Sequence, residues 1–116
     1  MTKGTNQLGR RGEAAAERYL TARGLKVLQR NWRDGPRGEI DLILEDGATV
    51  VFVEVKTRRG GEVAEVLSPA KRFRLTCLAA AWLRQSPGFH PYRIDLVGVQ
   101  PGPQGAQIHW WKGIDR

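Results

Sequence analysis

The chain has 116 residues, which is enough for one domain with a modest hydrophobic core. Its 19 lysine and arginine residues outnumber its 12 aspartate and glutamate residues, giving a formal net charge of +7. No apolar run approaches the roughly 20 residues that cross a bilayer, and the N-terminus lacks the apolar segment of a secretory signal. We therefore expect a cytoplasmic protein without a membrane partner. The positive charge favours a polyanionic partner, nucleic acid first, over a basic but inert surface.

The first half of the chain predicts one helix and three strands. Apolar spacing indicates a helix over residues 8–23, which Gly24 ends. A loosely alternating strand follows over 25–32, and a glycine- and proline-containing turn leads into two apolar strands, 39–44 and 49–57. An Asp-Gly pair between these two strands predicts a β-hairpin. Both faces of the hairpin are largely apolar, so we expect it to lie centrally with layers packed on both sides.

The second half predicts a helix and two strands. Ser68 is the expected N-cap of a helix that begins at Pro69 and runs to about residue 85, with Phe73 on its buried side. Strands follow over 92–99 and, at an edge, over 107–112. The strand–helix–strand connection should be parallel and right-handed. The predicted fold is α/β, a mixed sheet flanked by helices in the order α-β-β-β-α-β-β, forming one domain over residues 1–116.

Three charged residues stand where the hairpin strands should be apolar: Asp41, Glu54 and Lys56. A two-residue loop at Asp46-Gly47 would set Glu39 opposite Glu54 and Asp41 diagonal to it, with all four charged side chains on one face. Carboxylates at roughly 4 Å repel by about 4 kcal/mol in an effective dielectric of about 20. A divalent cation would remove that repulsion, and Lys56 would offset part of it.

A metal-assisted phosphodiester hydrolase needs such a constellation. Magnesium takes one or two carboxylates together with waters and substrate phosphate, and Asp41 and Glu54 meet that need. Lys56 would hold the attacking water or stabilise the charge that develops at phosphorus. The purely structural alternative is a salt-bridged strand end at the margin of the sheet.

Glu13 is a third candidate acid. On the first helix it lies about 20° from Leu20, at the border of the apolar stripe, so it can face the sheet. The alternative is a boundary glutamate that pairs with a neighbouring base. For Glu39 two roles stay open: support of the site and a purely structural role.

Basic residues could form a phosphate track around these acids. A pair begins the first helix, a pair follows Lys56, and further bases lie in the first turns of the second helix. The candidates for contact with nucleic acid are Arg10, Arg11, Arg58, Arg59, Lys71, Arg72 and Arg74. A solvated basic face is the alternative for each of them.

The motifs together resemble those of a bacterial family, the YraN-like uncharacterised proteins. They are Gly9-x-x-x-Glu13, Tyr19-Leu20, Gly38-Glu39-Ile40-Asp41-Leu42-Ile43, Phe52-Val53-Glu54-Val55-Lys56-Thr57-Arg58, Lys71 and Arg93-Ile94-Asp95. That family is similar to the restriction-endonuclease-like (PD-(D/E)xK) superfamily, near archaeal Holliday-junction resolvases. The resemblance implies that Asp41 is the motif aspartate, Glu54 and Lys56 the Glu-x-Lys, and Glu13 the acid of the first helix. No proline precedes Asp41, unlike the pattern in the superfamily's name.

The function that we predict is a Mg²⁺- or Mn²⁺-dependent DNA endonuclease, with selectivity for branched DNA left open. Asp41, Glu54 and Glu13 are its expected metal ligands. A non-catalytic nucleic-acid-binding or DNA-repair accessory domain is the second hypothesis, and a protein-interaction domain with incidental charge is the third. Resolvase-like proteins act as dimers, so the resemblance also allows a homodimer.

Overall fold

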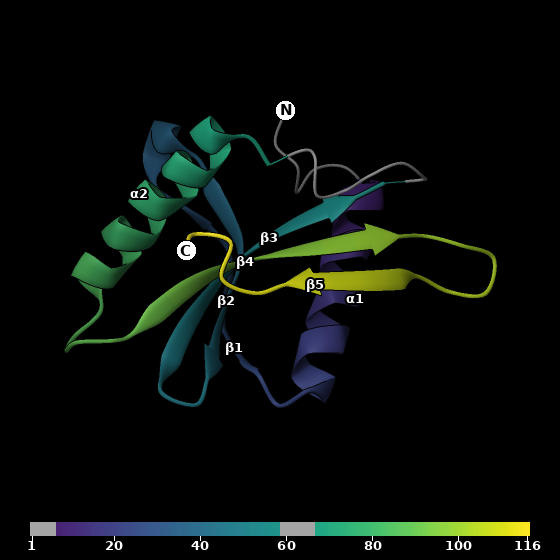
Figure 1. Cartoon of the computed structure of the whole chain (residues 1–116), viewed down its shortest axis with the longest axis horizontal. Coiled ribbons are helices and arrows are strands. Elements are labelled where there is room, and N and C mark those ends of the chain that lie inside the picture. Colours follow the sequence, from purple (N-terminus) through teal and green to yellow (C-terminus); the bar gives the residue numbers. More distant parts are fainter. Residues whose placement is uncertain (1–6, 59–66) are drawn as a thin grey trace.

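The chain forms a five-stranded mixed sheet with one helix on each face, seen in a computed structural model that describes residues 7–58 and 67–116 (Figure 1). The elements in chain order are α1 (Gln7–Ala22), β1 (Lys26–Arg33), the 3-10 turn η2 (Gly35–Arg37), β2 (Glu39–Asp46), β3 (Thr49–Thr57), α2 (Pro69–Gln85), β4 (Tyr92–Gln100) and β5 (Gln107–Trp111). The strands lie in the order β1-β2-β3-β4-β5. Only the β3–β4 pair is parallel. The predicted α/β fold, element order and edge position of the last strand are confirmed.

The helix α2 begins at Pro69, directly after its N-cap residue Ser68. The Ser68 hydroxyl oxygen accepts a hydrogen bond from the Lys71 backbone N–H at 3.2 Å, and Pro69 occupies the first helical position. The prediction that Phe73 is buried is wrong, because 71% of this residue is exposed. At 100° per residue Phe73 lies about 180° around the helix from Trp82, opposite the stripe that packs on the sheet.

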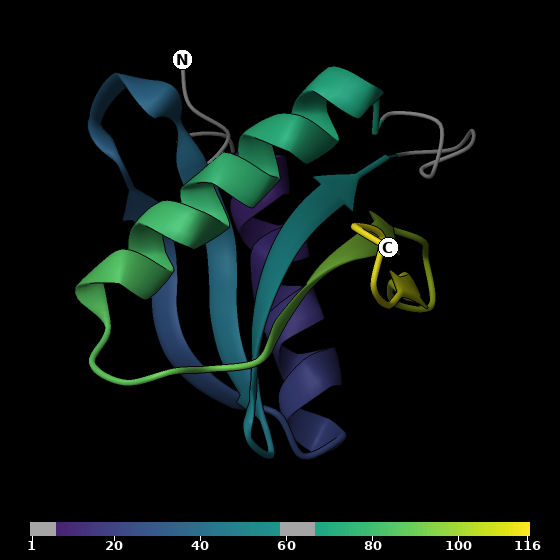
Figure 2. The ribbon, with the colours of Figure 1, turned by 60° about the vertical axis from the view of Figure 1, so that its left-hand side comes forward.

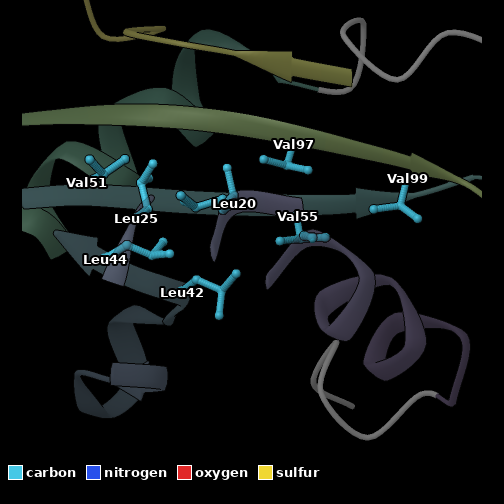
Figure 3. Packing of buried hydrophobic residues seen from close by; sticks show 10 residues of the cluster. Leu20, Leu25, Leu42, Leu44, Val51, Val55, Val97 and Val99 are labelled. Carbon is cyan, nitrogen blue, oxygen red and sulfur yellow. The ribbon is translucent and has the colours of Figure 1, made fainter. Parts of the chain in front are cut away.

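Two hydrophobic clusters hold the layers together. Beneath α1, Leu20 packs with side chains from β2, β3 and β4 (Figure 3). Labelled in that view are Leu20, Leu25, Leu42, Leu44, Val51, Val55, Val97 and Val99. Beneath α2, Leu75 and Leu78 pack against Phe52 and Ile94 on the opposite face of the sheet. Figure 2 shows α2 in front of the sheet and α1 behind it. The hairpin is therefore covered on both sides, as its two apolar faces predict.

The register of the β2–β3 hairpin differs from the predicted one by two residues. The turn is Gly47-Ala48, with Asp46 paired to Thr49 and Ile43 to Phe52. The prediction placed the loop at Asp46-Gly47 and Glu39 opposite Glu54, and this is wrong. Glu39 is instead the partner of Arg33 on β1. Gly47 adopts a φ of 61°, the left-handed conformation that glycine tolerates, which explains why the turn centres one residue later. A shift of two residues preserves which side chains share a face.

Side chains of β1 and β2 stop alternating regularly between the two faces of the sheet near Asn31. Arg30 contacts α1 through Glu17, whereas Trp32, two residues further on, packs beneath α2. Between them Asn31 has a φ of 50°, and among the described residues it is the one non-glycine residue with a positive φ. Ile40, the partner of Trp32, likewise packs beneath α2, where strict alternation predicts the face of α1. The left-handed residue thus turns the strand ends relative to the rest of the sheet.

Candidate metal and nucleic-acid site

Asp41 lies where β2 and β3 separate. The paired residues of this hairpin end at Leu42 and Val53, one step before Asp41 and Glu54. There the Val55 backbone N–H donates to Asp41 Oδ2 at 2.7 Å, so a carboxylate replaces a main-chain acceptor. Figure 2 shows the two strands moving apart from their turn toward these ends. The hydrogen bond fixes the orientation of a carboxylate that is only 1% exposed.

Glu54 and Lys56 form an ion pair on β3. The Lys56 Nζ atom lies 3.7 Å from Glu54 Oε2, and both side chains are largely buried. Alternation along the strand places them on the face of Val50 and Phe52, which pack beneath α2. Glu54 and Asp41 are both buried at this end of the hairpin. Burial of charged groups is costly unless they are paired, and here Lys56 pairs with Glu54.

Glu13 approaches the same level of the sheet from α1. It is buried, and its Oε1 atom accepts a hydrogen bond from Asn31 Nδ2 at 2.9 Å. Within the described part of the chain, the buried Oε2 atom has no hydrogen-bond partner. Glu13 lines a pocket of about 230 Å³ together with Arg10, Ala14, Glu17, Arg30, Asn31 and Leu42. The prediction that Glu13 faces the sheet is confirmed, and its partner is a β1 amide rather than a base.

Three polar residues form a row across three strands. Arg30 pairs with Leu42 and Trp32 with Ile40, so Asn31 on β1 lies across from Asp41 on β2. Asp41 in turn accepts a hydrogen bond from the Val55 backbone N–H on β3, the residue after Glu54. Residues directly opposite each other in antiparallel strands have Cα atoms roughly 4.5–5.5 Å apart. The row therefore leads from the partner of Glu13, through Asp41, to the Glu54–Lys56 pair.

The carboxylates offer the ligand chemistry that a hard divalent cation prefers. Magnesium is commonly held by one or two carboxylates, with waters and substrate phosphates completing its shell. Among residues 7–58 and 67–116, no three His, Cys, Asp or Glu side chains are grouped closely enough to hold a metal ion. A cation held by Asp41 and Glu54 therefore stays a prediction, and so does Glu13 as a direct ligand.

The second carboxylate on α1, that of Glu17, is paired with an arginine. Glu17 accepts hydrogen bonds of 2.7 and 2.8 Å from the Nε and Nη2 atoms of Arg30. These hydrogen bonds hold the pKa of Glu17 below its ordinary value, against a smaller raising effect of partial burial. Glu17 is thereby paired at the rim of the pocket that Glu13 lines, which leaves Glu13 as the α1 carboxylate with an unpartnered oxygen.

The candidate phosphate-binding residues lie on both sides of the sheet. Arg10 and Arg11 are exposed on α1, and Arg58 is exposed just after β3, where its backbone N–H donates to Val99 O at 2.9 Å. Lys71 is half-buried in the first turn of α2, and Arg72 and Arg74 are exposed on that helix. Arg59 lies outside the described residues. Their contact with nucleic acid stays a prediction.

The conspicuous Arg93-x-Asp95 motif has a structural role. Asp95 is fully buried on β4, and its carboxylate accepts hydrogen bonds from Arg93, from Trp110 Nε1 and from the Gly113 backbone N–H. Arg93 also binds Asp46 at 3.0 Å. This network ties β5 and the hairpin turn to β4. Because the Asp95 carboxylate is fully engaged, it is not a candidate for chemistry.

Comparison with known proteins places the chain in a family. It matches "Uncharacterised protein family UPF0102" over residues 12–99, a region that includes Glu13, Asn31, Asp41, Glu54 and Lys56. The chain belongs to the UPF0102 family. A UPF0102 protein of Streptomyces coelicolor is 46% identical over 106 residues, covering 87% of this chain and 82% of that protein. One from Symbiobacterium thermophilum is 47% identical over 105 residues, covering 87% and 88%.

The UPF0102 assignment confirms that the chain belongs to an uncharacterised family, as its motifs indicate. A third relative, from Mycolicibacterium vanbaalenii, is 48% identical over 105 residues and carries the same family name. These names state no activity. In the described residues no helix has the length and apolar character needed to span a membrane.

Sequence reasoning missed Asn31. The Arg30-Asn31-Trp32 segment reads as ordinary strand, although Asn is depleted in strands. The available signal was Asn itself, since it tolerates the left-handed conformation better than other non-glycine residues. Its hydrogen bond to Glu13 depends on the docking of α1, which no local pattern reports.

Proposed function

We propose that this chain is a divalent-metal-dependent DNA endonuclease of the restriction-endonuclease-like type. The observation that carries the proposal is that buried Asp41 and Glu54 lie just past the last pair of the β2–β3 ladder, with Lys56 Nζ 3.7 Å from Glu54 Oε2. The net charge of +7 supports a polyanionic substrate. The confirmed order of helices and strands is the order that the resemblance to Holliday-junction resolvases implies.

Each residue has a chemical role in this proposal. Asp41 and Glu54 would hold Mg²⁺ or Mn²⁺, which when bound acts as a Lewis acid toward the phosphate and lowers the pKa of a bound water. Asp41 is oriented by Val55, so it is positioned before a cation arrives. Lys56 places a positive charge beside Glu54, where it can stabilise the negative charge that develops on the phosphate oxygens.

The direct test is cleavage of supercoiled and branched DNA with Mn²⁺, Mg²⁺ or chelator. The wild-type protein should cleave only with metal, and Asp41→Asn and Glu54→Gln should each abolish cleavage. Glu45→Gln is the matched control, because it makes the same acid-to-amide change on β2 outside the carboxylate pair. Activity in chelator, or full activity in both site variants, would place the chemistry elsewhere.

Binding without cleavage is the outcome that the accessory-domain hypothesis expects. If roughly six phosphates are contacted, DNA affinity should fall about 10³-fold between about 50 and 200 mM salt. Arg58→Glu should weaken binding to all sequences alike, because phosphate contacts position the protein without reading bases. Salt-sensitive binding that is unaffected by metal, with no cleavage of any substrate, would support the accessory role. Salt-independent binding would exclude both nucleic-acid functions.

A further inference from the structure

The edge strand β5 carries an aromatic stack formed by His109 and Trp111 (Figure 1). The centroids of the two rings are 5.8 Å apart, and their planes are inclined by 25°. Ile108 and Trp110, which alternate with them along the strand, pack with the cluster beneath α1. His109 and Trp111 therefore point to the face of the sheet that bears α2. His109 is exposed and Trp111 is half-buried, so the stack presents the His109 ring to solvent.

The aromatic stack lies level with the ion pair on β3. Lys56 is paired with Gly98 on β4, and Gly98 is paired with His109 on β5. Two residues earlier on β3, Glu54 leads in the same way through Leu96 to the second ring of the stack. Residues paired across a sheet share a face, and two strand spacings separate β3 from β5 by roughly 10 Å. The stack and the ion pair therefore lie on one face of the sheet, with only glycine between Lys56 and His109.

Packing of the core accounts for only one ring of the stack. Trp111 is paired with the buried Leu96, so its indole adds to the apolar contacts at this edge. The exposed ring of His109 contributes little to a core. Aromatic side chains beside a basic groove bind nucleic acid by stacking on its bases, which is sequence-tolerant because every base has a π face. The net charge of +7 favours such a polyanionic ligand.

We propose that the stack of His109 and Trp111 binds an unpaired base of the DNA substrate, as found at a flap, a branch or a single-stranded end. The base stacks on the exposed side of His109, and Trp111 supports the ring from the other side. A base inside a duplex is unable to reach a side-chain ring without leaving the helix, so the ligand is unpaired. At 3.4 Å per nucleotide, roughly 10 Å places this base about three nucleotides from a phosphate at Lys56. The inference rests on the proposed function and narrows its substrate to DNA with unpaired bases.

The test is binding of a fluorescently labelled single-stranded oligonucleotide to the full chain, measured by anisotropy in chelator so that no metal-dependent cleavage occurs. Loss of one base–aromatic stack weakens affinity by about 5- to 150-fold, and we expect His109→Ala to fall in this range. His109→Phe should bind like the wild type because it keeps a ring, whereas His109→Lys should bind weakly although it adds positive charge. Phe89→Ala is the matched control, since Phe89 is 92% exposed but precedes β4, at the opposite end of the sheet. Circular dichroism checks that each variant is folded.

An abasic oligonucleotide of the same length separates base contacts from phosphate contacts. The wild type should bind it more weakly than the ordinary oligonucleotide, and His109→Ala should lose most of that difference. Wild-type affinity in His109→Ala, or binding restored by His109→Lys and not by His109→Phe, would overturn the stacking role. These measurements need no cleavage, so they separate this inference from the proposed function. Loss of base binding in His109→Ala with an inactive wild type would refute the nuclease alone, whereas unchanged binding with metal-dependent cleavage would refute the base site alone.

Discussion

Gly12 of α1 packs directly against Thr57 at the end of β3, with no room for a side chain between them. A Cβ atom on Gly12 would overlap Thr57 Oγ1 and lie 3.1 Å from Thr57 Cβ. Glycine inside a helix normally costs about 1 kcal/mol relative to alanine. Here it lets the helix approach the strand closely. The contact joins the residue before Glu13 to the residue after Lys56, so it sets the distance between the two parts of the site.

Gly12→Ala should therefore destabilise the protein, although helix propensity alone favours alanine. Overpacking of this kind costs about 1–3 kcal/mol of unfolding free energy, which chemical denaturation can measure. Thr57→Ala removes the overlapping oxygen, so the double variant Gly12→Ala/Thr57→Ala should recover part of the loss relative to Thr57→Ala. A Gly12→Ala variant that is more stable than the wild type would show that α1 does not rest on Thr57.

The site illustrates which features of this chain follow from local sequence. The helix beginning at Pro69 was predictable because capping by Ser68 is a local interaction. The shared face of Glu54 and Lys56 was predictable because strand alternation has a period of two residues. The hairpin register was missed by two residues, since it depends on which residue of the turn adopts a positive φ. An even shift keeps the shared faces along the paired part of the hairpin, which ends at Leu42 and Val53.

The contribution of α1 could be predicted only in part. Helical spacing places Glu13 at the border of the apolar stripe and therefore toward the sheet. The donor that it meets there is Asn31, which is itself the left-handed residue of β1. The contact between the two residues also requires the close approach of α1 at Gly12. Both are consequences of tertiary packing, and so the pairing of Glu13 with Asn31 has no signature in either segment alone.

Lys56→Met should abolish turnover while leaving Mn²⁺ and DNA affinity within a few-fold of the wild type. The physical reason is that Lys56 pairs with Glu54 at 3.7 Å and carries the charge proposed to act in the transition state. Single-turnover cleavage and equilibrium binding, measured on the same preparation, separate the two effects. Lys112→Met is the matched control, since Lys112 lies over the Trp110 ring on the far strand. Equal losses of binding and turnover in Lys56→Met would make Lys56 a DNA anchor.

The Glu17–Arg30 pair predicts a specific pH dependence of stability. Because the folded-state pKa of Glu17 is lowered from 4.5, its contribution is fully present above that pH and is lost as pH falls through the folded pKa. Urea unfolding of the wild type and Glu17→Gln should therefore differ at neutral pH and converge in acid. The difference should be small and should shrink in high salt, because Arg30 is exposed and Glu17 is only partly buried. A gap that widens as pH falls would contradict the assignment.

DNA shape rather than base sequence should determine affinity. The described elements include no helix–turn–helix, and a domain of this size covers little DNA, so selectivity would come from flexibility, branches or ends. We expect tighter binding to four-way or flapped DNA than to linear duplex of equal length, in competition at about 150 mM salt, near physiological screening. Sedimentation of the same samples reports whether two copies bind one branched molecule. Equal affinity for all shapes by a monomer would exclude junction resolution while leaving a general nuclease.

The most direct test of the metal site is a crystal soaked in Mn²⁺ and measured at a wavelength where manganese scatters anomalously. We expect a peak between Asp41 and Glu54, within direct coordination distance of their carboxylate oxygens. The peak should be absent in Asp41→Asn crystals soaked in the same way. A wild-type crystal with manganese bound only at other positions, or with the same peak retained in Asp41→Asn, would contradict the claim that these two carboxylates form the catalytic metal site.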